Sequence, residues 1–415
     1  MNTQRTAALT ARAAQTFQAL RHRNFLLLWI GMIVSMTGRW VMITAQSWLV
    51  YELTGSAFLL GMVGFCTSLP TFFLSPLGGA FADRLDRRKL LMVTQCSMMV
   101  FVLALATLIT TGVIEVWHIL LIAALSGSVM AFDMPTRQAL VPELVGEEDL
   151  TNAIALNSSV FHGTRIWGPT IAGLLVPLIG TGGCFYLTGA SYAGIVGALL
   201  LMKVPPRVSR ARETTVWRNM AEGFGYVRTS SIVLILVAMA AVSSLFGTAQ
   251  RSLMVIFAED VLNVGPSGFG FLMGASGVGA LIAALAVASL GDFRYKGWLL
   301  FIGAVIRGLT LLFFAMSTHM PLSLAILLIG GASETAYMTM NNTIMLLSAP
   351  DHMRGRVMSA YTLTTAGLTP LAALQGGTLA QFLGAPFAIG LGGSICALFA
   401  LVMAFAAPSL RRFAS

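Results

Sequence analysis

Long apolar spans recur along almost the whole chain of 415 residues, and they constrain its fold more than any other feature. Each span has about 20 residues or more, which is the length at which an α-helix crosses the hydrocarbon core of a bilayer. Open strands in lipid would leave backbone groups unpaired, and these runs do not alternate as the strands of a membrane barrel do. We therefore expect about twelve transmembrane helices. Their expected positions are residues 24–51, 57–81, 89–111, 117–134, 151–181, 184–202, 231–258, 267–290, 298–317, 321–348, 358–383 and 386–408.

Composition excludes a soluble domain, and the placement of the charges argues against a nucleic-acid partner. Hydrophobic residues make up 57% of the chain and charged residues 10%, with a mean hydropathy of +0.83. About 25% of an ordinary soluble domain is charged. The net charge of +9 is divided among short basic clusters between the apolar spans, so we interpret it as setting orientation among membrane lipids. The four cysteines lack the spacing of a zinc site, and no Walker sequence occurs, so no metal or cofactor is expected.

Basic residues lie on every second connection between the apolar spans. They occur in the N-terminal tail, after the second, fourth, sixth, eighth and tenth spans, and at the C-terminus. The opposite connections carry no lysine or arginine, only Glu52, Glu115, Glu259 and Asp260. The positive-inside rule therefore predicts that both termini are cytoplasmic.

The two halves of the sequence align without gaps at an offset of 209 residues. This offset pairs Gly61 with Gly270 and Gly168 with Gly377, and glycines recurring in register indicate a duplicated six-helix unit. The polar segment between the halves carries an amphipathic pattern, which predicts a helix at the membrane surface. The expected organisation is a cytoplasmic tail at 1–23, a six-helix bundle at 24–203, a cytoplasmic linker with an interfacial helix at 204–230, a second six-helix bundle at 231–408 and a cytoplasmic tail at 409–415.

The residues Gly79-x-x-x-Asp83-Arg84-x-x-Arg87-Arg88 after the second span resemble the signature loop of the major facilitator superfamily. Four further motifs resemble its enterobactin exporter-like branch, also called transmembrane secretion effectors. They are Leu20-Arg21-x-Arg23-Asn24-Phe25, Trp48-Leu-Val-Tyr51-x-Leu-Thr-Gly55-Ser56, Asp133-x-Pro135-x-Arg137 and Arg354-Gly355-Arg356-Val357. The resemblance covers nearly the whole chain. It implies an all-α integral membrane fold of two pseudo-symmetric six-helix bundles, and a secondary transporter rather than an enzyme, placed in the inner membrane of a bacterium.

The resemblance also implies a gate at the cytoplasmic side. Asp83 would lie near the N-terminus of the eleventh helix, where a carboxylate gains roughly 0.3 to 1 kcal/mol from the helix dipole. Arg87 or Arg88 would pair with Asp133 while the cavity faces outward. Simple membrane anchoring is the alternative for the basic residues of this loop. We prefer anchoring for Lys89 and the gate for Asp83 and Asp133, which the positive-inside rule does not require. The expected gating residues are Gly79, Asp83, Arg84, Arg87, Arg88, Asp133 and Asp292, with the last in a degenerate second copy of the loop. The family loop usually has glycine where this chain has Asp86, which predicts a different local turn.

Five charges remain inside apolar spans after the loop residues are counted. They are Arg39, Arg165, Arg251, Arg307 and Glu334. A charge at the bilayer centre costs at least about 2.5 to 3.5 kcal/mol, so such residues are functional candidates. Four arginines against one glutamate predict a cationic cavity for an acidic, partly apolar cargo, because guanidinium groups match carboxylate or phosphate oxygens in pairs.

The roles of these five charges differ. Arg39 and Arg165 have no evident acidic partner in their own half, so they are our preferred cargo-binding residues. For Arg251 an outer-surface position stays open beside a cavity role, and for Arg307 a structural ion pair with Glu334 stays open. Glu334 is the candidate for proton coupling, with Asp133 as the competing candidate.

A motif in the fifth span bears on the direction of transport. Gly168-Pro169-x-x-Ala172-Gly173 resembles the antiporter motif of exporters in the superfamily, although plain helix packing explains the same residues. Together these features predict proton-coupled efflux of a small acidic or amphiphilic molecule such as a siderophore, without an obligatory protein partner. A broad multidrug exporter is the alternative, and a transport-inactive membrane sensor is a more distant one.

Overall fold

Helices make up the regular structure of the described residues, which are 17–203, 216–290, 294–411 and 413 of this computed structural model. Residues 1–16, 204–215, 291–293, 412 and 414–415 lie outside them, and Asp292 is among these. The helices are η1 (Gln18–Arg21), α2 (Arg23–Thr54), α3 (Ala57–Arg84), α4 (Arg87–Thr110), α5 (Val116–Leu144), η2 (Glu147–Asp149), α6 (Leu150–Leu201), α7 (Val216–Thr229), α8 (Ser231–Gly247), α9 (Ala249–Ile256), η3 (Phe257–Val261), α10 (Gly265–Ser289), α11 (Lys296–Ala315), α12 (Met320–Ser348), α13 (Arg354–Leu383), α14 (Ala385–Ala406) and α15 (Pro408–Arg411).

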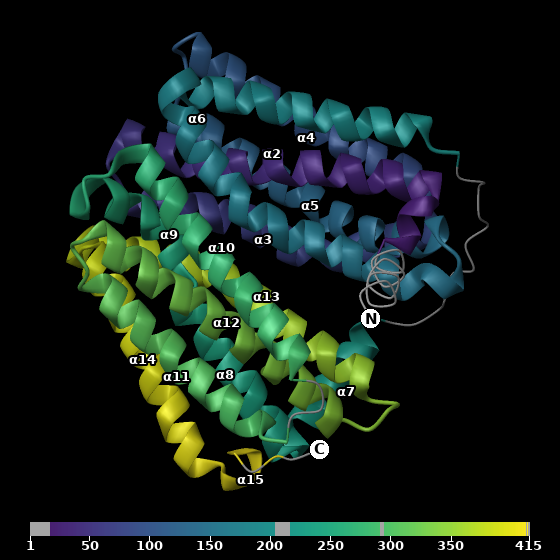
Figure 1. Cartoon of the computed structure of the whole chain (residues 1–415), viewed down its shortest axis with the longest axis vertical. Helices are drawn as coiled ribbons and strands as arrows, with labels where there is room; N and C mark the ends of the chain where they lie inside the picture. Colours follow the sequence, from purple (N-terminus) through teal and green to yellow (C-terminus); the bar gives the residue numbers. More distant parts are fainter. Residues whose placement is uncertain (1–16, 204–215, 291–293, 412, 414–415) are drawn as a thin grey trace, which may run out of the picture.

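Eleven helical segments in the described part of the chain are long and apolar enough to cross a bilayer, and one of them contains two crossings. That segment includes α6, whose 52 residues would form a rod of about 78 Å if straight. Gly180 breaks it with φ of 71°, and the ribbon turns back on itself (Figure 1). At the other irregular span, α8, α9 and the π-helical turn η3 together make one crossing. The twelve predicted crossings are therefore present.

Several helix boundaries differ from the sequence prediction, because helices continue beyond their apolar runs. The charged loop between α3 and α4 is short, since α3 extends to Arg84 and α4 begins at Arg87. Asp86 has an ordinary φ of −60°, and its side chain accepts a hydrogen bond from the backbone N–H of Lys89 at 3.1 Å. The residue that departs from the family pattern is thus a helix N-cap. Likewise α5 continues past position 134 to Leu144.

The predicted linker helix is α7, and it packs on the C-terminal half. Glu222 of α7 forms an ion pair with Arg356 of α13 at 2.5 Å, and Val227 is buried. A Cβ at Gly223 would lie 2.3 Å from the carbonyl oxygen of Arg356, so only glycine permits this approach. The linker is therefore tied to the start of α13.

The two halves meet at one end of the bundle and diverge toward the other (Figure 1). The meeting end carries Glu52, Glu115, Glu259 and Asp260, and we call it the acidic end. The diverging end carries the α3–α4 turn, η1, α7 and α15, and we call it the basic end. At the acidic end Tyr51 of α2 donates a hydrogen bond to Asp260, and Ser56 donates one to Gln381 Oε1 at 2.9 Å.

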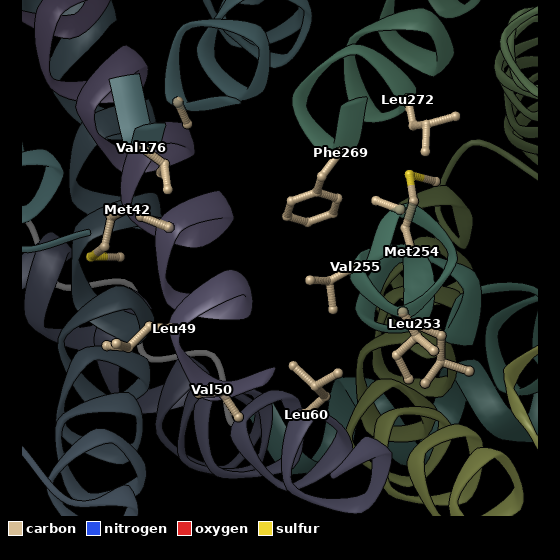
Figure 2. Close-up of a cluster of buried hydrophobic side chains, with 14 of the residues drawn as sticks. Met42, Leu49, Val50, Leu60, Val176, Leu253, Met254, Val255, Phe269 and Leu272 are labelled. Carbon is tan, nitrogen blue, oxygen red and sulfur yellow. The ribbon is translucent and has the colours of Figure 1, made fainter. Parts of the chain in front are cut away.

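Apolar side chains from both halves close the acidic end. One buried cluster includes Met42 and Val50 of α2 together with Val255 of α9 and Phe269 of α10. Phe269 and Val255 point toward the side chains of the N-terminal half (Figure 2). Burial of this surface at roughly 25 cal/mol per Å² favours the closed arrangement.

Glycine contacts between the halves follow a two-fold pattern that corrects part of the sequence alignment. A Cβ at Gly61 of α3 would lie 2.9 Å from the Cα of Gly377 in α13. In the equivalent contact, a Cβ at Gly270 of α10 would lie 2.8 Å from the Cα of Gly173 in α6. Gly61 and Gly270 are equivalent as predicted, but the structural counterpart of Gly377 is Gly173 and not Gly168. The gapless alignment fails here because the halves differ in length between these contacts.

Candidate functional site

Four of the five charges predicted to lie inside apolar spans meet at one point. Arg251 Nη2 donates a hydrogen bond to Glu334 Oε1 at 2.6 Å. Arg165 Nη2 lies 3.7 Å from Glu334 Oε2, and Arg307 Nη2 lies 3.7 Å from Glu334 Oε1. We call these residues the Glu334 cluster. Three guanidinium groups face a single carboxylate, so the cluster is net positive.

The Glu334 cluster joins the two halves of the molecule. Arg165 belongs to α6 of the N-terminal half, whereas its three partners lie on α9, α11 and α12 of the C-terminal half. A Cβ at Gly277 of α10 would lie 3.1 Å from the carbonyl oxygen of Arg165, so glycine at this position lets α10 approach α6 at this level. The acidic partner that Arg165 lacks in its own half is thus supplied by the other half.

Arg307 is held by the interruption between α8 and α9. Its guanidinium donates to the carbonyl oxygen of Gly247 at 3.3 Å and to the hydroxyl of Ser243. A Cβ at Gly247 would lie 2.9 Å from Arg307 Nη2, so the glycine leaves space for the guanidinium. The ion pair of Arg307 with Glu334 that the sequence left open exists, but Arg251 and Arg165 share the same carboxylate.

The cluster borders a cavity of about 260 Å³ within the C-terminal half. Arg251, Arg307 and Glu334 line it together with polar side chains such as Thr248 and Tyr361. Arg251 is 48% exposed and points to Glu334, which places it in the cavity. Of the two interpretations open for Arg251, the structure supports the cavity position. We call this space the C-terminal cavity.

Arg39 lies apart from the Glu334 cluster. It lines a second cavity of about 230 Å³, formed mainly by α2, α3, α4 and α5 of the N-terminal half, which we call the N-terminal cavity. The predicted cargo-binding arginines are therefore divided between two cavities. Within the described ranges, no group of three histidine, cysteine, aspartate or glutamate side chains gathers as a metal site would.

Asp133 is buried in a polar network inside the N-terminal half. Its carboxylate accepts hydrogen bonds from Thr94 Oγ1 at 2.9 Å and Gln95 Nε2 at 2.5 Å, and it pairs with Arg137 Nη2 at 3.2 Å. Neither Arg87 nor Arg88 pairs with it in this conformation. The expected pairing is replaced by one within α5, because Asp133 and Arg137 are one helical turn apart and face the same interior.

The burial of Asp133 predicts a large loss of stability when it is changed. Asp133→Asn leaves the buried Arg137 without its counter-ion, so we expect the free energy of unfolding to fall by about 3 to 5 kcal/mol. Unfolding in mixed micelles with increasing SDS measures this change. Asp83→Asn is the matched control, because the Asp83 side chain is 68% exposed and its pair is worth less than about 1 kcal/mol. Equal unfolding midpoints for the two variants would contradict the assignment.

Gly79, Asp83, Arg84, Arg87 and Arg88 of the predicted gate lie around the α3–α4 turn at the basic end, where the two halves diverge (Figure 1). Arg87 pairs with Glu143 at 2.7 Å and with Asp83 at 3.7 Å. Arg88 donates to the carbonyl oxygens of Leu199 and Leu200 at the end of α6. Arg84 is exposed, and a Cβ at Gly79 would meet open space. These contacts anchor the turn to its own half, and closure against the other half stays a prediction.

The helix-packing role of the fifth-span motif is visible in the structure. A Cβ at Gly168 would lie 2.4 Å from the Cβ of Trp40, and Gly173 and the carbonyl oxygen of Pro169 contact Gly270. The motif therefore packs α6 against α2 within its half and against α10 across the halves.

Some residues of these sites were missed by the sequence prediction. Ser243, Gln95 and Thr94 contact the buried charges but have ordinary polar side chains, which carry no signal in a membrane sequence. Gly78 rather than Gly79 makes the close contact of α3 with α5, since a Cβ there would lie 1.9 Å from the carbonyl oxygen of Ala131. Two adjacent glycines cannot be told apart without knowing which one faces the neighbouring helix.

Comparison with known proteins agrees with this architecture. The transmembrane secretion effector family matches residues 14–415. The multidrug efflux pump Tap of Mycolicibacterium fortuitum is 24% identical, covering 86% of this chain and 90% of that protein. The staphyloferrin A transporter of Staphylococcus aureus is 26% identical, covering 81% of this chain and 84% of that protein. The enterobactin exporter EntS of Shigella boydii is 25% identical, covering 77% of this chain and 74% of that protein.

Solved structures show the same fold. A bacterial homologue of the human lysosomal transporter Spinster, in an inward-facing and occupied conformation, superposes with a TM-score of 0.75 at 13% identity, covering 93% of this chain and 97% of that one. A POT family transporter in complex with 5-aminolevulinic acid gives a TM-score of 0.72 at 14% identity, covering 94% of this chain and 97% of that one. The predicted all-α architecture of two six-helix halves is confirmed. This multi-pass membrane protein belongs to the transmembrane secretion effector family, a branch of the major facilitator superfamily of transporters.

Proposed function

We propose that this transporter exports a small acidic or amphiphilic molecule, such as a siderophore, by proton-coupled alternating access. The observation that carries the proposal is the Glu334 cluster, in which arginines from both halves converge on one carboxylate beside a cavity. A net positive site suits an anionic cargo. Because this site bridges the two halves, movement of the halves against each other changes how tightly the anion is bound. The staphyloferrin A transporter and the enterobactin exporter among the relatives support the siderophore class.

The basic end is the proposed cytoplasmic end, with both termini on that side. The alternation of basic and acidic connections supports this orientation through the positive-inside rule. The conformation then faces inward, with the acidic end closed toward the outside. In the opposite state Asp83 and its neighbouring arginines would close the basic end against α13, and the Glu334 cluster would be reached from outside.

Glu334 is the proposed coupling residue. Its ionised carboxylate occupies the guanidinium groups that an acidic cargo needs, so the cargo and the carboxylate compete for Arg165 and Arg251. Protonation of Glu334 removes the repulsion between the two anions, so one proton binds and leaves together with the cargo, and a cargo with two or more negative charges still crosses as an anion. A membrane potential that is negative inside also favours outward movement of an anion, by about 2.3 kcal/mol per charge for each 100 mV.

A broad multidrug exporter is the second candidate function. The N-terminal cavity favours it, because Met42, Met98 and Met130 line it and methionine side chains adapt to differently shaped ligands. The relative Tap is described as a multidrug efflux pump. Lipophilic cations would nevertheless meet the positive Glu334 cluster, so we rank this candidate second.

Transport in proteoliposomes tests the proposal. We expect a pH gradient, and separately a potassium diffusion potential, to drive movement of radiolabelled phthalate, an acidic aromatic probe that permeates lipid slowly. Arg165→Gln should reduce this movement roughly tenfold or more, because a charge-assisted hydrogen bond to the anion is lost. Arg228→Gln is the control, since Arg228 is exposed on α7 and distant from both cavities in sequence and placement.

One outcome would reject the proposed export, and another would reject only its site. If neither gradient moved phthalate while tetraphenylphosphonium was transported, the multidrug candidate would replace it. If phthalate moved equally well in the wild type and in Arg165→Gln, export of an anion would stand but the Glu334 cluster would not be its site.

A further inference from the structure

The N-terminal cavity contains an arginine that its surroundings do not neutralise. Among the hydrogen bonds and ion pairs of the described residues, none involves the Arg39 side chain, whereas each arginine of the Glu334 cluster has a carboxylate within 4 Å. Asp133 is the nearby acid, and Arg137 already balances it at 3.2 Å. Arg39 is therefore a surplus positive charge beside a cavity.

Polar groups around Asp133, near Arg39, also lack hydrogen-bond partners. Arg137 Nη1, Gln95 Oε1 and the hydroxyl of Tyr192 are buried without a hydrogen-bond partner in the described structure. Arg137 and Gln95 are 4% and 2% exposed, so bulk water does not supply their missing hydrogen bonds. Buried polar groups are normally paired, and an unpaired charge in a membrane span costs at least about 2.5 kcal/mol. Of these groups only Arg39 lines the N-terminal cavity, so its charge is the one that a bound anion can neutralise.

The N-terminal cavity combines this charge with polar and apolar walls. Gln46, Ser47 and Ser68 supply hydrogen-bonding groups, while Met98 and Met130 supply apolar surface. This lining of polar and apolar residues in roughly equal number suits a small amphiphilic molecule.

The two cavities adjoin at α9. Ser252 of α9 lines the N-terminal cavity, and the preceding residue, Arg251, lines the C-terminal cavity and binds Glu334. One molecule that reaches around this helix can therefore contact Arg39 at one end and the Glu334 cluster at the other. The wall of the N-terminal cavity also offers apolar surface from Met42, Ile43 and Val63 for the middle of such a molecule.

We propose that the N-terminal cavity is a second acid-binding subsite, and that the preferred cargo is an elongated molecule with an acidic group at each end and an apolar middle. One end binds the Glu334 cluster and the other binds Arg39. This inference rests on the proposed function for the first end, and it names the class of substrate that both ends together select.

Binding of two matched acids to the transporter in lipid nanodiscs tests the inference. Decanedioate carries a carboxylate at each end, and decanoate carries one, on a chain of the same length. We expect wild type to bind decanedioate more tightly than decanoate, after subtraction of binding to empty nanodiscs. Arg39→Gln should weaken decanedioate binding roughly tenfold and leave decanoate unchanged, because only the second carboxylate reaches Arg39. Arg165→Gln should weaken both.

Two further variants protect the test against a folding defect. Arg39→Lys keeps the charge and should retain most of the preference for decanedioate. Ser47→Asp keeps Arg39 but places a negative charge in the same cavity, and it should lose the preference as Arg39→Gln does. Thermal unfolding of each variant identifies any loss of the fold.

The result that overturns the inference is an equal effect of Arg39→Gln on both acids, or no effect on either. Failure of wild type to bind decanedioate more tightly than decanoate overturns it as well. Phthalate transport is measured separately, and its absence would reject the proposed export. The preference for decanedioate over decanoate would still report on the second subsite.

Discussion

Replacing Glu334 with glutamine is expected to remove gradient-driven transport and to destabilise the protein by about 3 kcal/mol, the lower end of the loss for a broken buried ion pair. The substitution leaves Arg165, Arg251 and Arg307 facing one another without an anion. Arg251 is 48% exposed, so water screens part of the repulsion and keeps the loss at that lower end. Proteoliposome transport and unfolding in SDS mixed micelles measure the two effects.

A bound anion distinguishes this electrostatic role from simple packing. Phthalate should raise the thermal unfolding temperature of Glu334→Gln more than that of wild type, because it replaces the missing carboxylate among the arginines. Glu259→Gln is the matched control, since Glu259 is exposed at the acidic end and should change neither transport nor stability. If phthalate stabilised wild type and Glu334→Gln equally, the guanidinium groups would not be the anion site.

Replacing Gly61 with valine is expected to shift the protein away from the conformation closed at the acidic end. A Cβ at this position would lie 2.4 Å from the carbonyl oxygen of Ala373 and 2.9 Å from the Cα of Gly377, so α3 and α13 cannot keep their present contact. Overpacking typically costs about 1 to 3 kcal/mol, which changes the ratio of the two conformations roughly 5- to 150-fold. Spin-label distances between the basic ends of α4 and α13, in a cysteine-free background, should shorten.

A glycine inside one half provides the control for this conformational effect. Gly78→Val places a Cβ 1.9 Å from the carbonyl oxygen of Ala131, but both helices belong to the N-terminal half and move together. It should lower thermal stability without altering the distances between the halves. The interpretation of the Gly61 contact would be wrong if both variants changed the spin-label distances alike.

The number and nature of the helices could be predicted because lipid leaves few solutions. A span of this length must satisfy its backbone groups internally, whatever it packs against. The prediction separated 151–181 from 184–202, where Gly180 breaks α6. It placed the ends of α3 and α5 too early, because polar contacts stabilise the helices beyond their apolar runs. Arg87 donates a hydrogen bond to the carbonyl oxygen of Ala82 near the end of α3, and the buried Asp133–Arg137 pair lies within α5.

The sequence by itself determined which charges lie within apolar spans, where a charge is costly in any fold. Only the tertiary structure decided their partners. Arg165 meets Glu334 because α6 and α10 pack closely across the halves, and Asp133 meets Arg137 because both face the interior of one half. Partnership depends on which helix faces come together, and that arises from packing between residues far apart in the chain. The division of the arginines into two cavities has the same cause.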